Sequence, residues 1–480
     1  MQHTSSDSTA RGLWRRLTDP LRAALGGPAQ LRAVFLLAGV LAVASADSAT
    51  VGAIGSNLEQ ALRIGNGQIG LLVSVSTGVG ALATLPVGVL VDRVSRTRLL
   101  AVSLVLWCAA MIASGASVSY PMLLVSRLAL GAVVATAMPA VASIIGDLFP
   151  AADRGRAYGF VLAGELLGAG AGLLAGGDIA AVLGWRAAFW ALAVPSLILA
   201  AVIHYRFAEP IRHQHDTSGD NSADATAKKE AMRQRIRPRP RLVLRNDPTR
   251  RPLWWVVRYV LSIPTNVALI LASGIGYFFF AGLRTFAVVF LQQRFGFGQA
   301  AASSLIVIIG AGAIIGVLVS GRLSDRAIRR HRMTARPVVS GVAFIVVAAL
   351  FVPALLVGTF AVAGVLLFLG AGALGATNPP LDAARLDIMH SRLWGRAESV
   401  RTVLRSALQA LAPVLFGYLS TVLAAGGHGA AAGLDRTFLI MLVPVVLAGL
   451  ILLLVARRTY PRDVATAAAS EHATSAVTHG

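Results

Sequence analysis

Charged residues are scarce in this chain. Of its 480 residues only 14% are Asp, Glu, Lys or Arg, whereas 56% are hydrophobic. A soluble globular protein carries about 25% charged residues. The shortage excludes an ordinary soluble enzyme and indicates a molecular surface that faces lipid.

Cysteine and lysine are also nearly missing. Cys108 is the single cysteine, so no disulfide can form within the chain. Lys228 and Lys229 are the only lysines, and the net charge of +21 therefore comes from arginine. The arginines lie between apolar runs rather than on one compact basic face, which excludes nucleic acid as the partner.

Motifs for catalysis and nucleotide binding are missing as well. The sequence has no H-E-x-x-H, no G-x-S-x-G and no Walker A lysine, so neither hydrolysis nor ATP-driven transport is supported. A non-transporting membrane receptor, the alternative of another class, is expected to add a sizeable sensory domain. We expect no enzyme activity, no metal and no cofactor.

Long apolar runs are what the sequence has in abundance. About 20 apolar residues cross the hydrocarbon core as a helix, and twelve such segments are predicted. They are 33–57, 67–91, 99–117, 121–146, 156–178 and 186–205, then 264–291, 299–320, 337–357, 359–381, 397–423 and 437–456. The expected fold class is an all-α membrane protein of two pseudo-symmetric six-helix bundles. The polar residues before the first span do not fit a cleaved signal peptide.

One connection is much longer than the others. It begins with a polar stretch, His213 to Lys229, that we expect to be disordered. Farther on, Trp254, Trp255 and Arg258 predict a short helix on the membrane surface. The expected domains are a tail (1–32), a bundle (33–205), this linker (206–263), a second bundle (264–457) and a second tail (458–480).

Arginine alternates from one connection to the next. It is abundant in both tails, in the linker and in the second, fourth, eighth and tenth connections, and it is sparse in the others. By the positive-inside rule, the termini and the linker face the cytoplasm. The expected location is the inner membrane, crossed an even number of times.

The two sets of six spans repeat each other. The residues Gly88, Asp92, Arg93 and Arg96 end the second span, and Gly321, Asp325, Arg326 and Arg329 stand 233 residues later. Asp147 and Gly155-Arg156 match Asp387 and Gly395-Arg396 at a spacing of 240. This spacing indicates a duplication, as in many transporters.

The motif G-x-x-x-D-R-x-x-R at both places resembles the signature of the major facilitator superfamily, and Arg127-x-x-x-Gly131 resembles another of its elements. The resemblance implies a secondary transporter that works by alternating access, by default as a monomer. A span-five pattern is similar to that of the family's proton-coupled exporters, although Leu173 stands where those have proline. It consists of Gly159, Gly168, Gly172, Gly176 and Gly177. Close packing of helices is the alternative interpretation.

The resemblance also implies a latch that holds the outward-open state. Its residues would be Gly88, Asp92, Arg93, Gly321, Asp325 and Arg326. The glycines would let helices approach closely, and each aspartate would meet the N-terminal end of a facing helix or an arginine. Arg96 and Arg98 are expected only to mark the cytoplasmic side.

Six ionisable residues are predicted inside the spans, where charge is costly and indicates function. They are Asp47, Arg127, Glu165, Arg284, Arg401 and Arg405. Asp47 is the first choice for the proton-coupling site and Glu165 the second, because burial and a nearby arginine such as Arg127 act on a carboxyl group in opposite senses. A static ion pair between helices is the alternative for both carboxylates.

The substrate cavity is expected to include Arg284, Arg401, Arg405 and Phe280. Arg401 and Arg405 share one helical face and would together hold an anionic headgroup or carboxylate. Glu165 corresponds to Arg405 at the spacing of 240, so we expect the two to face each other. Arg284 would pair with Asp47 or join the other arginines.

Proton-driven efflux of a hydrophobic or amphiphilic molecule, drug-like or lipid-like, is the function these features indicate. The proton gradient replaces a cofactor, and membrane lipids and the cargo are the expected partners. The segments Gln68–Leu72 and Ile145–Pro150 resemble the spinster branch, which implies a lysophospholipid or sphingolipid-like cargo as one alternative. Proton-coupled import of an organic anion is another.

Overall fold

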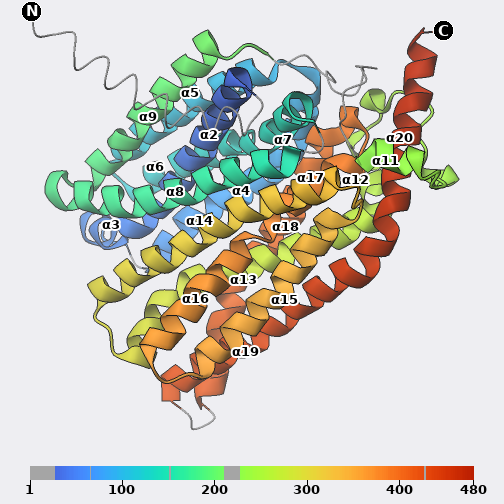
Figure 1. Cartoon of the computed structure of the whole chain (residues 1–480). Helices are drawn as coiled ribbons and strands as arrows, with labels where there is room; N and C mark the ends of the chain where they lie inside the picture. Colours follow the sequence, from blue (N-terminus) through green and yellow to red (C-terminus); the bar gives the residue numbers. More distant parts are fainter. Residues whose placement is uncertain (1–26, 65, 151–152, 210–226, 426–428, 480) are drawn as a thin grey trace, which may run out of the picture.

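The computed structural model describes residues 27–64, 66–150, 153–209, 227–425 and 429–479, and in these residues all regular secondary structure is helical, without strands. Twelve helical segments among them are long and apolar enough to cross a membrane. They form two six-helix bundles that lie against each other (Figure 1). The predicted fold class is confirmed.

The first bundle comprises α2 (Pro28–Ala53), α4 (Asn66–Arg93), α5 (Arg96–Gly115), α6 (Tyr120–Val134) with α7 (Ala137–Leu148), α8 (Arg154–Leu183) and α9 (Trp185–Arg206). The second comprises α13 (Pro264–Phe295), α14 (Gln299–Arg329), α15 (Ala335–Leu356), α16 (Phe360–Gly375) with α17 (Asn378–Asp387), α18 (Trp394–Ala425) and α19 (Gly429–Leu450). A short helix, α3 (Gly55–Leu62), follows α2. Each predicted span overlaps one of these elements.

The fourth and tenth spans are each broken near their middle. The break between α6 and α7 precedes Pro139, and the break between α16 and α17 precedes Pro379 and Pro380. Proline lacks the N–H that an inner helical turn requires and clashes with the preceding turn. Pro139 and Pro379 are 240 residues apart, so the two bundles share this interruption.

The linker is partly helical. Residues 210–226 lie outside the described residues, but Lys228 and Lys229 belong to α11 (Ala227–Arg233), so the expected disorder is wrong for this end of the polar stretch. Two 3₁₀ turns follow, Pro240–Leu242 and Pro248–Arg250. The helix predicted around the tryptophan pair is present as α12 (Leu253–Ser262).

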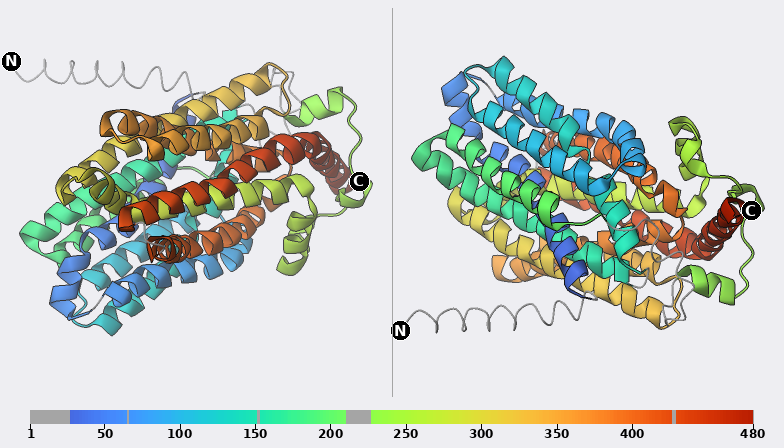
Figure 2. Two further views of the ribbon diagram at one scale, coloured as in Figure 1. Left: turned by 90° about the horizontal axis from the view of Figure 1, so that it is seen from below. Right: turned by 90° about the horizontal axis from the view of Figure 1, so that it is seen from above.

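The expected C-terminal tail is a helix rather than a loose end. A π-helical turn, Ile451–Ala456, joins α19 to α20 (Arg457–His479), which extends past the bundle beside α11 (Figure 2). Lys228 Nζ pairs with Glu471 at 2.5 Å. Arg239 Nε pairs with Asp463 at 2.7 Å. The linker and the C-terminal helix therefore form one layer at this end of the molecule.

Candidate functional site

A buried ion pair joins the first and fourth spans. Arg127 Nη1 donates to Asp47 Oδ1 at 2.7 Å, and Arg127 Nη2 donates to Asp47 Oδ2 at 2.8 Å. Only 2% of Asp47 and 1% of Arg127 is exposed. Two parallel hydrogen bonds of this kind match the planar guanidinium to the carboxylate. Arg127, and not Arg284, is thus the partner of Asp47.

The glycine motif of the fifth span holds α8 against α2. A Cβ added to Gly168 would overlap Ala42 O, and one added to Gly172 would overlap Ala46 O. Gly176 approaches Thr50 in the same way, while the Cβ of Gly177 would make ordinary contact and that of Gly159 would meet α14 of the other bundle. The geometry therefore agrees with the close-packing interpretation of this motif.

A second charged group lies between the bundles. Glu165 on α8 lies within electrostatic range of Arg405, Arg284 and Arg401, all from the second bundle, and Arg405 has the largest effect of the three. Glu165 and Arg405 are only half buried, and Arg284 is exposed, although all three lie within spans. The Arg405 guanidinium stacks 4.2 Å above the Tyr277 ring. The charge of Arg405 therefore acts on Glu165 across the two bundles, and direct pairing of the two side chains stays a prediction.

Phe280 lies on the same side of α13 as this charged group. It is half buried, and the helical repeat aligns it with Tyr277 and Arg284. Its neighbour Phe279 is fully buried and packs edge-on against Phe351. Of the phenylalanine run, Phe280 is thus placed to present an aromatic ring beside the charges.

Arg401 does not join Arg405 as a second free cation, contrary to expectation. It is fully buried, and its Nη1 donates to Asp382 at 2.7 Å while its Nη2 donates to Glu398 at 2.7 Å. Arg385 pairs with the same two carboxylates. These four residues form a charge-balanced cluster in α17 and α18. Asp47 and Glu165 are therefore not the only carboxylates inside the spans.

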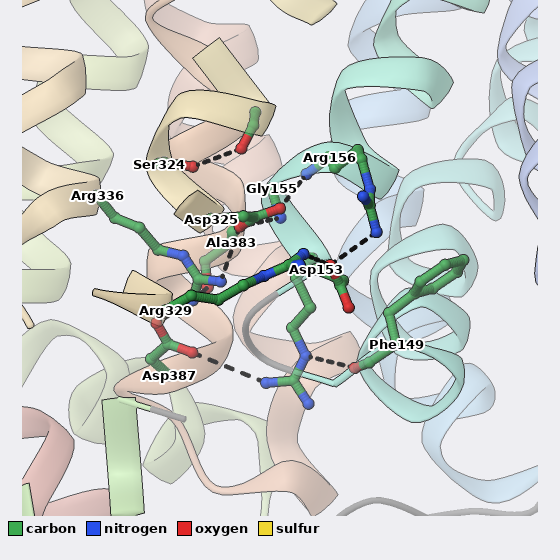
Figure 3. Close-up of polar contacts among 12 residues, drawn as sticks. Phe149, Asp153, Gly155, Arg156, Ser324, Asp325, Arg329, Arg336, Ala383 and Asp387 are labelled. Atoms are coloured by element: carbon green, nitrogen blue, oxygen red, sulfur yellow. Dashed lines mark hydrogen bonds and ion pairs between the residues drawn. The ribbon is translucent and has the colours of Figure 1, made fainter. Parts of the chain in front are cut away.

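One end of the molecule is closed by contacts between the bundles, and Asp325 makes one of them (Figure 3). Its Oδ1 accepts a hydrogen bond from Gly155 N at 3.2 Å, and its Oδ2 accepts one from Arg156 N at 2.7 Å. Because α8 begins at Arg154, the carboxylate lies at the positive end of the helix dipole. The predicted contact of an aspartate with a facing helix end is present.

Asp92 makes the corresponding contact from the first bundle. Arg396 Nε lies 3.1 Å from Asp92 Oδ2, near the start of α18. A Cβ added to Gly395 would lie 2.5 Å from Asp92 Oδ1, so the backbone of α18 passes directly over the carboxylate. Each aspartate therefore faces the beginning of a helix of the other bundle. We call this end of the molecule the latch end.

The motif glycines allow this close approach. A Cβ at Gly88 would overlap Ser399 Oγ, and a Cβ at Gly321 would overlap Gly155 O. Real side chains cannot occupy such positions, so a larger residue would force the bundles apart. Gly88 and Gly321 are thus required for the closed geometry.

The arginines of the latch are different from those expected. Arg93 and Arg326 are exposed, and neither forms an ion pair among the described residues. Arg96, expected to be only a topological marker, is 1% exposed and pairs with Asp147. At the spacing of 240, Arg336 pairs with Asp387 in the second bundle. Both partners of the pair recur at the repeat spacing of 240, so this spacing could have predicted the two pairs.

Glu209, just after the sixth span, holds Arg96 in place. Its Oε1 accepts from Arg96 Nε at 2.9 Å, and its Oε2 accepts from Thr97 N at 2.9 Å and from Ser95 Oγ at 2.7 Å. Burial acts to raise the pKa of Glu209, but the hydrogen bonds from Thr97, Arg96 and Ser95 outweigh it and lower the pKa to about 2. No pattern in the sequence pointed to this residue.

Two duplicated helical bundles with buried charges and matched closing contacts define a multi-pass membrane transporter. The chain belongs to the Major Facilitator Superfamily, whose family model matches residues 36–413. A curated relative, the MFS-type transporter phiD from Fungal sp. (strain ATCC 74256), is 24% identical over 277 residues. The match covers 56% of this chain and 42% of that relative, so the chain spans less than half of the relative's length.

Solved structures of the superfamily share the fold. A bacterial homologue of the human lysosomal transporter Spinster, inward-facing and unoccupied, is 19% identical with a TM-score of 0.58, covering 91% of this chain and 98% of the other. The proton:xylose symporter XylE bound to 6-bromo-6-deoxy-D-glucose is 15% identical with a TM-score of 0.65, covering 88% and 95%. The human organic anion transporter MFSD10 (TETRAN) is 15% identical with a TM-score of 0.65, covering 88% and 99%.

Proposed function

We propose that this transporter exports an amphiphilic small molecule in exchange for protons. The observation that carries the proposal is the separation of two charged groups: the sealed Asp47–Arg127 pair within one bundle, and the accessible group of Glu165, Arg284 and Arg405 between the bundles. The first suits a proton and the second suits a cargo. A carboxylate buried inside a membrane span is costly, and its presence at Asp47 is therefore a reason to look for a function.

Proton binding at Asp47 would require release of Arg127. A proton on either carboxylate oxygen removes one of the two acceptors that the guanidinium uses and cancels the charge that it balances. Protonation would therefore loosen the contact between the first and fourth spans. The same glycine packing that brings α8 onto α2 transmits this change toward Glu165, which lies on α8.

The cargo that fits the second group has an apolar body and a negatively charged or zwitterionic head. Two arginines and one carboxylate leave an excess positive charge, and the rings of Tyr277 and Phe280 lie on the same helical face. A drug-like anion, a lysolipid or a fatty acid meets this description. We place the protein in the inner membrane, as a monomer, with the latch end and both termini in the cytoplasm.

Import of an organic anion together with protons is a second candidate. The exposed Arg284 beside Glu165 favours it, because an anion entering from outside would compete with the carboxylate for the arginine. The two candidates predict opposite directions of proton movement when cargo flows down its own gradient. In export by exchange, protons cross the membrane in the direction opposite to the cargo. In symport, protons and cargo cross in the same direction.

The test uses purified protein in liposomes that contain a pH dye. Permanently charged drug-like anions and lysolipids are added without a pH gradient, to the wild type, to Asp47→Asn and to a matched control, Asp178→Asn, whose carboxylate is exposed on the same bundle. We expect cargo-dependent proton movement in the wild type and the control, and none in Asp47→Asn. Equal movement in Asp47→Asn would refute the coupling site. Silence of the wild type with every cargo would refute the proposed function.

A further inference from the structure

Helix α12 carries an exposed stripe of apolar and cationic side chains. We call Trp254, Arg258 and Leu261 the α12 stripe. Trp254 is 66% exposed and Leu261 is 41% exposed. Their spacing of four and three residues places them on one face of the helix. An exposed tryptophan and leucine beside an arginine suit contact with lipid where a span leaves the membrane.

The opposite face of α12 fixes how the stripe points. Val256, Tyr259 and Val260 are buried, and the Tyr259 hydroxyl donates to Leu242 O at 3.1 Å. Only Ile263 separates α12 from α13, the seventh span, which begins at Pro264. The helix therefore lies where that span leaves the membrane, and it cannot turn the stripe inward without breaking its own packing.

The charge of this surface is positive. The Arg258 guanidinium lies 5.9 Å from the Trp254 ring, and the Arg251 guanidinium lies 5.4 Å from the Trp255 ring. Helix α12 contains no acidic residue. Other exposed arginines at the latch end include Arg241, Arg245, Arg457 and Arg458. Tryptophan and arginine together are typical of helices that lie among lipid headgroups.

The linker just before α12 is bound to the latch. Arg396 Nη2 donates to Thr249 O at 2.7 Å, and Arg396 Nη1 lies 3.4 Å from the carbonyl oxygens of Pro248 and Arg251. The same guanidinium lies 3.1 Å from Asp92 through its Nε. A single buried arginine thus contacts the chain that leads into α12 and the motif aspartate of the other bundle.

We propose that the α12 stripe binds an anionic phospholipid of the leaflet at the latch end, and that this binding stabilises the closed latch. The lipid phosphate would lie on Arg258 and the lipid chains against Trp254 and Leu261. An anionic membrane surface attracts each nearby arginine. When lipid holds α12 in place, the backbone carbonyls of the linker keep their hydrogen bonds to Arg396. Arg396 in turn keeps its ion pair with Asp92. The proposal does not depend on which cargo is carried.

Binding is tested first, in detergent, by the unfolding temperature of the whole protein. Phosphatidylglycerol should raise this temperature more than phosphatidylcholine does in the wild type and in the control Arg330→Gln, which removes an exposed arginine at the same end. The difference should be lost in Arg258→Gln and in Trp254→Ser. An equal difference in Arg258→Gln and Arg330→Gln would overturn the binding site. The same rise with water-soluble glycerophosphate would show that the site takes a free anion rather than a lipid.

The effect on the latch is tested by thiol labelling. Ser399 is fully buried against Gly88, so Ser399→Cys, in a Cys108→Ser background, should react only when the latch end opens. In nanodiscs with about one anionic lipid in three, labelling should be slower than in phosphatidylcholine alone, by up to about fivefold where the full attraction of about 1 kcal/mol is lost on opening. Arg258→Gln should remove the dependence on lipid, and Arg330→Gln should keep it.

Two results of the labelling experiment would overturn the coupling. One is equal labelling of the otherwise unaltered protein in both lipids. The other is the same slowing in Arg258→Gln as in Arg330→Gln. Should Ser399→Cys fold poorly, Ser324→Cys offers the same measurement on the other side of the latch, because Ser324 is buried beside Gly155.

Discussion

Replacing Asp325 with asparagine should open the latch end. The change keeps the shape of the side chain but removes the negative charge that meets the N–H groups of Gly155 and Arg156 at 3.2 and 2.7 Å. Hydrogen bonds to a charged group contribute about 1.5–3 kcal/mol net, and a carboxylate at a helix N-terminus adds about 0.3–1 kcal/mol. Because the amide that replaces the carboxylate keeps one acceptor oxygen, we expect a loss of about 2 kcal/mol, or about thirtyfold in the ratio of open to closed protein.

The assay for this change measures thiol labelling at the second contact of the latch, the one that Asp325 does not make. Labelling of Ser399→Cys reports separation of α4 and α18, whereas Asp325 joins α14 to α8. Asp325→Asn should therefore raise the labelling rate by up to about thirtyfold only if the two contacts open together. Arg326→Gln is the matched control, since Arg326 is the next residue and is exposed. A rate within about twofold of the unaltered protein in Asp325→Asn, or an equal rise in the control, would refute the reasoning.

The packing and ion pairs of the first bundle predict three more outcomes. Gly168→Ala should destabilise the protein by about 1–3 kcal/mol through its clash with α2, whereas Gly170→Ala, with open space around it, should not, as thermal unfolding would reveal. Arg96→Gln should lower transport and stability strongly, because it leaves a buried carboxylate unbalanced, while Arg93→Gln should match the wild type in the same assays. The lowered pKa of Glu209 means that its stabilising effect is complete above about pH 4.5 and is lost as pH falls toward about 2, so Glu209→Gln should flatten the decline of unfolding temperature over this range.

The spans and the position of the latch were predictable from the sequence. Apolar runs of sufficient length define the spans whatever their neighbours are, and the repeated Gly-x-x-x-Asp-Arg marks the same place in both bundles. The breaks at Pro139 and Pro379 and the helical C-terminus were not predicted. The run Ala467-Ala468-Ala469 in α20 is rich in the best helix former, and that signal was available.

The partners of the charged residues were harder to predict, because they depend on which helices meet. Arg93 ends α4 and Arg96 begins α5, with a turn between them. Because of this turn, one motif arginine, Arg93, is exposed, while the other, Arg96, is buried. Arg401 and Arg405 do share a helical face, as expected, but Glu398 lies three residues before Arg401 and neutralises it. That spacing was visible in the sequence. Asp382, the other partner of Arg401, lies in a different helix, so this pairing could not be predicted from the sequence.

The two bundles agree at the latch and differ in their interiors. Arg96–Asp147 and Arg336–Asp387 are repeats of one pair, and each joins two helices within its own bundle, while Asp92 and Asp325 make the matched contacts that close the molecule. The pair Asp47–Arg127 has no charged counterpart in the second bundle: Phe280 stands 233 residues after Asp47, and Leu367 stands 240 residues after Arg127, while Arg405 stands where the first bundle has Glu165. A rocking motion needs matched contacts on both sides, whereas coupling and cargo selection need different chemistry on each. The residues that duplication did not preserve are therefore the ones that we propose for coupling and cargo selection.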